Sequence, residues 1–374
     1  MKKKKTYTLR KFINDVHLWL GLASGIILFL VCLSGTILAF EHEIKEAFAE
    51  ELQVVPNGDK ISIAVLKEKI TTENSGVLTG ISIPEAADEP YVFTVKENPN
   101  ERRGTNLMVN PYTGESLKPS ANPADAFCFF FFKMHRWLLL DSAIGRPIVG
   151  VATIIFLIIS ITGLVLWFPK KVKWKNVKSG FKIKTKANWK RVNHDLHNTL
   201  GFYALIFIVI MGITGLCWSF EWYREGLGDV IGAKVFNRSS PEFDLNENSD
   251  AAAISLTEVL KTADTLFDYP GAVTVNLPGE RSAFYSIRKK DDSAWSPSTS
   301  DVAYVSNTGE VLAVEKFSDK PFNVQIASLI KPLHTGEVFG FFSKFIYFLA
   351  CLIGTSLPVT GTLIWINKLK KKKK

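Results

Sequence analysis

Five of the six histidines in this chain of 374 residues lie beside long apolar segments. His17 and His197 stand at the start of two such segments, and His135 and His334 precede the other two. An ionisable residue at membrane depth is costly, so it is a candidate for function by default. Imidazoles that approach each other from facing helices can supply the two axial ligands of a six-coordinate haem iron.

Internal repetition of the sequence shows which histidines correspond. DVHLWLG at 15–21 matches DLHNTLG at 195–201, and TGLVLW at 162–167 matches TGTLIW at 360–365. A repeat of this kind is the signature of a duplicated unit. Each unit consists of an apolar segment, a long polar segment and a second apolar segment.

The duplication groups the histidines into two pairs. His17 corresponds to His197, and His135 corresponds to His334. Symmetry-related residues on different helices can face each other across the axis of a helical bundle. We therefore predict two haem irons, one bound by His17 and His197 and the other by His135 and His334.

His194 lies one turn before His197 and has no symmetric counterpart, because Asn14 stands in its place. It is an alternative to His197 as a ligand, a hydrogen-bond donor that holds another ligand in place, or a surface residue. The spacing of His194 and His197 would also suit zinc. However, Asp195 is expected to point away and no further Cys or carboxylate set completes a tetrahedral site, which disfavours zinc.

Gly21 and Gly201 lie four residues after the histidines of the first pair, on the same helical face. Small residues there leave room for a flat macrocycle, although they also allow helices to pack closely. Arg136 directly follows a histidine of the second pair. Its guanidinium is a candidate partner for a haem propionate, or it extends to the membrane interface.

The apolar segments are each about 20 residues or longer, which is enough to cross a ~30 Å hydrocarbon core as a helix. The net charge of +9 comes from short flanks: residues 1–11, 169–191 and 367–374 hold six, ten and six of the 45 basic residues. Basic short loops stay in the cytoplasm, so both termini and the central loop are predicted inside. The basic runs therefore indicate topology and contact with anionic lipid, not nucleic-acid binding.

The predicted fold is an α-helical membrane protein in which four transmembrane helices form a parallel, duplicated pair of hairpins, with two small α+β domains outside the cytoplasm. Short helices at 61–70 and 254–263 and alternating strand-like runs support the outer domains. The segments expected along the chain are a basic N-terminus (1–17), the first span (18–40), the first outer domain (41–123), an interfacial helix (124–143), the second span (144–168), a basic loop (169–195), the third span (196–220), the second outer domain (221–320), another interfacial helix (321–338), the fourth span (339–366) and a basic tail (367–374).

Four segments resemble the signature of the PepSY-associated transmembrane proteins: HLWLG at 17–21, MHRWL at 134–138, HDLH at 194–197 and LHTGEVFG at 333–340. The resemblance covers residues from about Arg10 to Leu369. It implies outer domains of the PepSY type, a bacterial inner membrane and a link to iron uptake. Some members are similar to ferric-siderophore reductases that carry two b-type haems, which would make His17, His135, His197 and His334 the ligands, with His194 as the alternative.

The resulting hypothesis is an oxidoreductase that passes electrons across the membrane to a ferric siderophore or another ferric chelate held between the two outer domains. The electron donor would be a quinol or a separate cytoplasmic reductase, because the sequence has neither a GxGxxG motif after a strand nor a Walker motif. Two alternatives remain open: a PepSY protein that binds a ligand and regulates a partner without redox chemistry, and a transporter component of iron uptake.

Overall fold

The structure is a computed structural model that describes residues 7–50, 52, 54–98, 101, 104–236, 241–243, 253–279 and 282–372. The chain forms two compact units, and each draws segments from both halves of the sequence. The first unit contains Met1–Phe48, Pro123–Phe236 and Ile326–Lys374, and the second contains Ala49–Asn122 and Asn237–Gln325. The predicted basic flanks are only partly covered, because residues 2–5, 373 and 374 lie outside the described residues.

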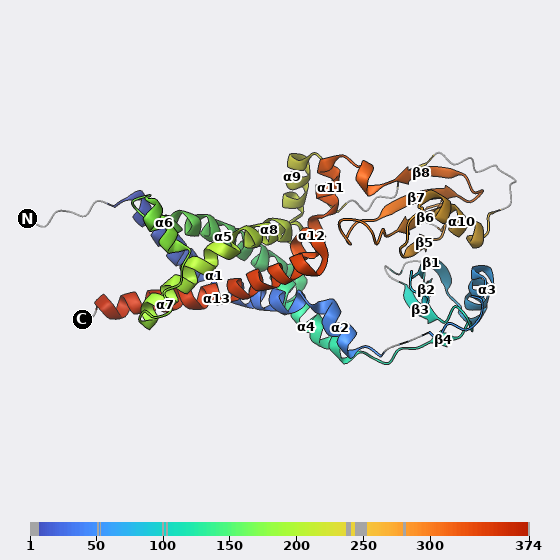
Figure 1. Cartoon of the computed structure of the whole chain (residues 1–374), viewed down its shortest axis with the longest axis horizontal. Helices are drawn as coiled ribbons and strands as arrows, with labels where there is room; N and C mark the ends of the chain where they lie inside the picture. The colour runs from blue at the N-terminus through green and yellow to red at the C-terminus, as the bar shows by residue number, and fades with distance from the viewer. Residues whose placement is uncertain are drawn as a thin grey trace, which may run out of the picture. The chain divides into compact units, whose positions relative to one another are not determined.

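The first unit is helical, and the described residues include four helical segments long and apolar enough to cross a membrane. α1 packs against both α5 and α13, and α8 packs against the same two helices, so the four close into a bundle (Figure 1). These helices are α1 (Leu9–Leu38), α5 (Ser142–Trp167), α8 (Gly201–Ser219), which continues directly from shorter helices before it, and α13 (Gly340–Lys372).

Shorter helices complete the bundle unit. α4 packs against α1 and α5, and α12 packs against α8. The segment α11 (Phe322–Ser328) leads from the second unit into the first. The remaining elements are α2 (Glu41–Phe48), α4 (Pro123–Trp137), α6 (Trp174–Gly180), α7 (Trp189–Asp195), the π-helical turn η1 (Leu196–Leu200), α9 (Glu221–Ile231), α12 (Ile330–Thr335) and the 3-10 turn η3 (Glu337–Phe339).

Two spanning segments begin earlier than the hydrophobic pattern predicts. α1 starts at Leu9 instead of residue 18, because the Thr8 side chain accepts a hydrogen bond from the Lys11 amide and caps the helix. The third segment starts at Trp189 instead of residue 196, and Asn188 caps it by accepting from the Arg191 amide. Polar first turns thus extend both helices beyond their apolar stretches.

The two helices predicted before the second and fourth spans also differ from expectation. α4 ends at Trp137, and Leu138 and Leu139 adopt positive φ angles of 55° and 60° that turn the chain before α5. Residues 321–338 form α11, α12 and η3 instead of one helix. Gly336, at φ +81°, ends α12 in the left-handed conformation that glycine tolerates best.

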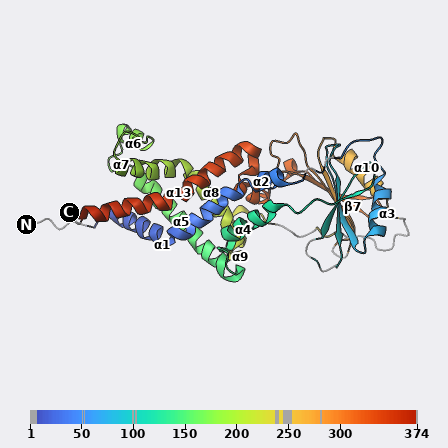
Figure 2. The same cartoon turned by 90° about the horizontal axis from the view of Figure 1, so that it is seen from below.

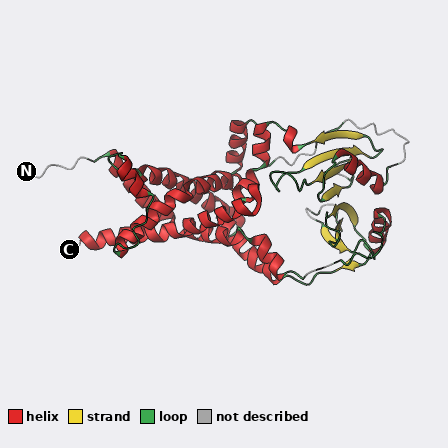
Figure 3. Cartoon of the chain, viewed as in Figure 1, coloured by secondary structure: helices red, strands yellow, loops and turns green. Residues whose placement is uncertain are grey.

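The second unit is an eight-stranded antiparallel sheet with α3 (Ile63–Glu73) and α10 (Leu256–Leu266) on one face (Figure 2). Figure 3 shows that the strands belong to this unit and that the first unit is helical. The strand order is β4-β3-β2-β1-β5-β6-β7-β8. Their bounds are β1 (Val77–Ile83), β2 (Tyr91–Lys96), β3 (Thr105–Val109), β4 (Ser116–Leu117), β5 (Val273–Asn276), β6 (Phe284–Lys289), β7 (Asp301–Ser306) and β8 (Val311–Glu315), and the 3-10 turn η2 (Phe317–Asp319) follows.

Strands β1 and β5 join the two halves of the chain into this one sheet, so the two outer domains predicted at 41–123 and 221–320 are one structural unit. Ile81 pairs with Val275, and Ser82 pairs with Thr274. A strand edge exposes unpaired backbone groups, and pairing the two inner edges satisfies them. The halves also share one hydrophobic core, to which both helices contribute.

Candidate functional site

The four paired histidines lie in the helical bundle as two facing couples. His17 of α1 faces His197 of η1, with ring centres 6.2 Å apart and ring planes at 88°. His135 of α4 faces His334 of α12, with ring centres 6.1 Å apart and ring planes at 60°. We call these the first and second pairs. Each pair takes one imidazole from each half of the duplicated sequence.

Both imidazoles of the first pair are held through Nδ1. His17 Nδ1 lies 3.0 Å from the Ile159 carbonyl oxygen and 3.0 Å from Thr162 Oγ1. His197 Nδ1 lies 2.9 Å from Thr360 Oγ1. Both threonine hydroxyls donate to carbonyls of their own helices, so they accept from the imidazoles. Nδ1 therefore carries the proton, and Nε2 keeps a free lone pair for a metal.

The second pair is held in the same way by the other two long helices. His135 Nδ1 lies 2.9 Å from the Val31 carbonyl oxygen and 3.3 Å from Ser34 Oγ. His334 Nδ1 lies 3.0 Å from the Met211 carbonyl oxygen and 3.1 Å from Thr214 Oγ1. All four histidines thus use Nδ1 for orientation, which leaves Nε2 as the potential ligand atom.

A glycine next to each hydroxyl residue lets the imidazole approach the helix backbone. A Cβ on Gly163 would lie 3.2 Å from His17 Cε1, and one on Gly361 would lie 3.1 Å from His197 Cε1. The corresponding distances are 3.1 Å from Gly35 to His135 and 2.9 Å from Gly215 to His334. We call each hydroxyl residue with its following glycine a histidine seat.

The sequence repeat at 162–167 and 360–365 contains two of these dipeptides, at 162–163 and 360–361, but does not reveal their role. The four seats are Ser34-Gly35, Thr162-Gly163, Thr214-Gly215 and Thr360-Gly361. The signal that could have revealed them is a hydroxyl residue followed by glycine that recurs at positions matched by the sequence repeat in all four apolar segments. Only the folded bundle shows that each seat supports a histidine of another segment.

A cavity of about 630 Å³ surrounds the first pair, within the ~300–1,000 Å³ range of pockets that hold small molecules. His17 and His197 line it, together with the glycines of both their seats. Gly21 and Gly201 line it too. At Gly21 a Cβ would meet nothing within 4 Å, so this wall faces open space.

The ligand set fits a porphyrin iron. A ligating imidazole nitrogen lies about 2 Å from its metal and the ring centre about 1 Å further back, so two axial imidazoles have ring centres about 6 Å apart. Both pairs have that spacing. Within the part of the chain that the structure describes, no group of three or more His, Cys, Asp or Glu residues could hold a metal by itself. Two imidazoles with the four nitrogens of a macrocycle complete six-fold coordination, whereas tetrahedral zinc lacks its further ligands.

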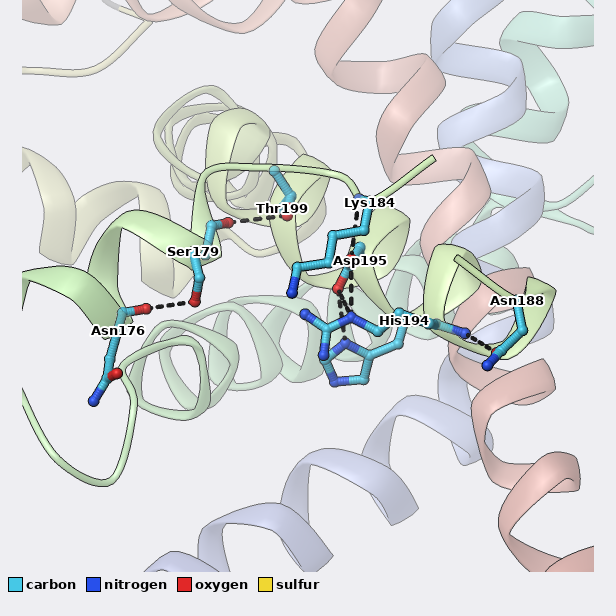
Figure 4. Close-up of polar contacts among 9 residues, drawn as sticks. Asn176, Ser179, Lys184, Asn188, His194, Asp195 and Thr199 are labelled. Atoms are coloured by element: carbon cyan, nitrogen blue, oxygen red, sulfur yellow. Dashed lines mark hydrogen bonds and ion pairs between the residues drawn. The ribbon is translucent and has the colours of Figure 1, made fainter. Parts of the chain in front are cut away.

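His194 does not face His17. Its side chain is 54% exposed at the mouth of the cavity, and its Nδ1 lies 3.5 Å from Asp195 Oδ1 (Figure 4). Asp195 is buried, and it accepts hydrogen bonds from Arg191 Nε at 3.0 Å and from the Lys184 amide at 3.2 Å. Asp195 therefore attaches the basic loop to α7, and the geometry favours His197 over His194 as the partner of His17.

Arg136 lies beside the second pair on α4. Its guanidinium carbon is 5.3 Å from the centre of the Phe132 ring and 5.5 Å from that of Trp137. Such contacts stabilise the cation over aromatic faces. The four cysteines are free thiols.

Comparison with known proteins agrees with this architecture. The family model described as the PepSY-associated TM region matches residues 15–368. A search of curated proteins found no match to the sequence. The family match includes all four facing histidines, their seats and the sheet. The chain is a multi-pass membrane protein that belongs to the PepSY-associated transmembrane family.

Proposed function

We propose that this protein binds two b-type haems and transfers electrons across a membrane to a ferric siderophore or another ferric chelate. The observation that carries the proposal is the pair of facing imidazole couples, with ring centres 6.2 and 6.1 Å apart and every Nδ1 engaged in a hydrogen bond. His17 and His197 would hold one iron, and His135 and His334 the other. When bound, haem supplies one-electron redox chemistry.

The hydrogen bonds repeat with the sequence and support a parallel duplicated pair of hairpins. In the second pair, Val31 and Ser34 correspond to Met211 and Thr214, each 180 residues later. In the first pair, Thr162 corresponds to Thr360, 198 residues later. The same arrangement, in which a hydroxyl residue and the following glycine contact one histidine, thus occurs four times.

The two pairs lie at different depths along the bundle. On α1, His17 belongs to the first pair, and Val31 accepts the hydrogen bond that orients the second. These residues are 14 positions apart, or about 21 Å along a helix, a large part of a ~30 Å hydrocarbon core. Two centres at these depths suit electron transfer from one membrane face to the other.

The charge distribution supports an orientation for this transfer. The basic flanks support an orientation in which the termini and the first pair would lie toward the cytoplasm of a bacterial inner membrane, and the second pair toward the outer face. The donor would then be a quinol or a cytoplasmic-side reductase. The substrate would take one electron at the outer face, where reduction of Fe(III) to Fe(II) weakens its binding to the chelator and releases iron.

The sheet modifies the hypothesis of a chelate held between two outer domains. Backbone pairing of β1 with β5 joins the two halves along their inner edges. We therefore assign chelate recognition to the sheet unit as a whole. A unit with its own core also suits a rival function, in which the protein binds a ligand and regulates a partner without redox chemistry.

Optical spectroscopy of the purified protein tests the proposal and separates it from this rival. We expect b-type haem bands in the reduced-minus-oxidised spectrum and two haems per chain. His17→Ala should remove one haem and leave the other, because only the first pair loses a ligand. Folded protein that takes up no haem would refute the proposal and favour the binding role.

A further inference from the structure

We propose that Lys170 and Lys368 form a carboxylate-binding collar at the mouth of the cavity and fix the orientation of the ligand inside. The inference rests on the proposed function and extends it. The ligand is an apolar macrocycle that carries two carboxylates on one edge. The collar would bind that edge, and the remainder of the ring would lie deeper between the histidines of the first pair.

The duplication places the two lysines in equivalent positions. Lys170 lies seven residues after Gly163, and Lys368 lies seven residues after Gly361. These are the glycines against which His17 and His197 pack. Each imidazole of the first pair therefore has one ammonium group at the same distance along the sequence from its seat.

Both lysines line the cavity at the end of the bundle where α1 begins and α13 ends (Figure 1). Arg10 lines the same mouth, seven residues before His17, or about 10 Å along the helix axis. Its guanidinium donates to the carbonyls of Leu166 and Phe168 at 2.8 and 2.7 Å. Arg10 thus fastens α1 to the end of α5 and adds positive charge to the mouth.

The deeper wall has the opposite character. Leu28, Phe156, Ile208 and Leu357 line the cavity there. A ligand with an apolar body and an anionic edge can satisfy both regions only with its charged edge at the mouth, because an unpaired charge in the deep part would be costly. The cavity therefore admits such a ligand in one orientation.

Haem b and its dimethyl ester provide the matched probes, because they differ in charge at the two propionates. We would titrate both into the full-length apoprotein, in a His135→Ala background so that only the first pair binds, and follow the Soret band. We expect the ester to bind about tenfold more weakly than haem, a difference that corresponds to about 1.4 kcal/mol. The Lys170→Ala/Lys368→Ala variant should lose most of this preference, with the charge of Arg10 left to favour haem at the mouth.

The neighbouring lysines supply the control. Lys171 and Lys370 belong to the same basic segments but do not line the cavity. Lys171→Ala/Lys370→Ala should therefore keep the tenfold preference for haem. Loss of the preference in this control would overturn the assignment to Lys170 and Lys368.

The same titration distinguishes the collar from the proposed function. If haem and its ester bind the unaltered first pair equally well, the collar is overturned while the haem centre stands. A lipid phosphate held by these lysines would give that result. If neither compound binds, the haem centre and the collar are overturned together.

Discussion

Gly215 supports the imidazole of His334 so closely that a Cβ at Gly215 would lie 2.9 Å from Cε1 of the histidine. A real Cβ atom almost never lies within 3.0 Å of a heavy atom to which it is not bonded. A Cβ at Gly215 would therefore force its neighbours to move. Backbone and imidazole are therefore matched at this seat, and the other three seats have nearly the same fit. Four close contacts of this kind make the positions of the histidines sensitive to single methyl groups.

Gly215→Ala should displace His334 and disable the second pair. The added methyl group cannot be accommodated without movement of the imidazole, and overpacking of this kind costs about 1–3 kcal/mol. We expect one haem per chain instead of two, measured by the pyridine haemochrome assay. Gly226→Ala in α9 is the control, because nothing lies within 4 Å of a Cβ there, and it should retain both haems. If Gly215→Ala still bound two haems per chain, the seat would not be needed to position His334.

Thr360→Val should weaken binding at the first pair while preserving shape. Thr360 Oγ1 accepts the hydrogen bond from Nδ1 of His197 at 2.9 Å. Loss of a partner that orients a ligand typically lowers metal affinity about 10- to 100-fold. Haem titration would measure the change. In Thr153→Val the hydroxyl removed bonds only to the Val149 carbonyl of its own helix, so affinity should stay unchanged.

The ion pair between Glu43 and Lys344 should connect α2 to α13 more strongly than a surface pair would. Glu43 Oε1 lies 2.5 Å from Lys344 Nζ, and the lysine side chain is only 12% exposed. Removal of Glu43 leaves the charge of Lys344 with little water around it, at a cost of about 1–3 kcal/mol. Glu43→Leu and Lys344→Met should each destabilise the protein, and the double variant should be less destabilised than the sum of the two. Additive effects in thermal unfolding would show that the residues are not coupled.

The same pair predicts a dependence of stability on pH. Burial raises the pKa of Glu43, but the hydrogen bond and charge of Lys344, together with a backbone hydrogen bond and the charge of His42, outweigh burial, so the pKa is lowered overall. A carboxyl with a lowered pKa in the folded state stabilises the protein above its unfolded pKa of about 4.3, and this contribution is lost as the pH falls through the folded value. Wild type should therefore lose stability on acidification more steeply than Lys344→Met, in unfolding measured from pH 6 to pH 3. Parallel curves would refute the coupling.

The seam between β1 and β5 predicts that the sheet unit responds as one body. Ile81 is buried at the seam and pairs with Val275 of the other half. Ile81→Ala creates a cavity that costs about 2–5 kcal/mol. We expect faster hydrogen exchange in β5 and β6 as well as in β1 and β2, measured by mass spectrometry. Exchange that rises only in β1 and β2 would indicate two independent domains.

A surface substitution provides the control for this experiment. Val65 on α3 is 54% exposed, so Val65→Ala removes little buried area. Exchange in all four strands should remain at the wild-type rate. An effect as large as that of Ile81→Ala would mean that the unit responds to any change in α3 and not to the seam.

The sequence contained enough information to group the histidines correctly by position, because duplication is visible in linear order. His17 and His197 stand in matching heptapeptides, and the structure brings their rings opposite each other with centres 6.2 Å apart. Alternating residues likewise indicated strand-like runs in the outer segments, where the structure has β1, β2 and β3. Local periodicity determines such features, and neighbouring residues are sufficient to see it.

Features that depend on distant segments could not be predicted. The β1–β5 seam joins strands almost 200 residues apart, and each strand alone carries the same alternating pattern as any edge strand. The seats were equally hidden, because Thr162-Gly163 resembles an ordinary small-residue helix contact until His17 is placed against it. The position of His194 depended on buried Asp195, whose partners come from the basic loop.

The β1–β5 seam and the two histidine pairs are alike in one respect. Each combines one strand or one imidazole from the first repeat with its equivalent from the second. A polypeptide that stopped after α5 would possess a single imidazole of each couple and a sheet with one bare inner edge. Two copies of that short polypeptide, related by a two-fold rotation, would complete every missing partner. The two halves produced as separate polypeptides should therefore still associate, because each supplies the partner that the other lacks.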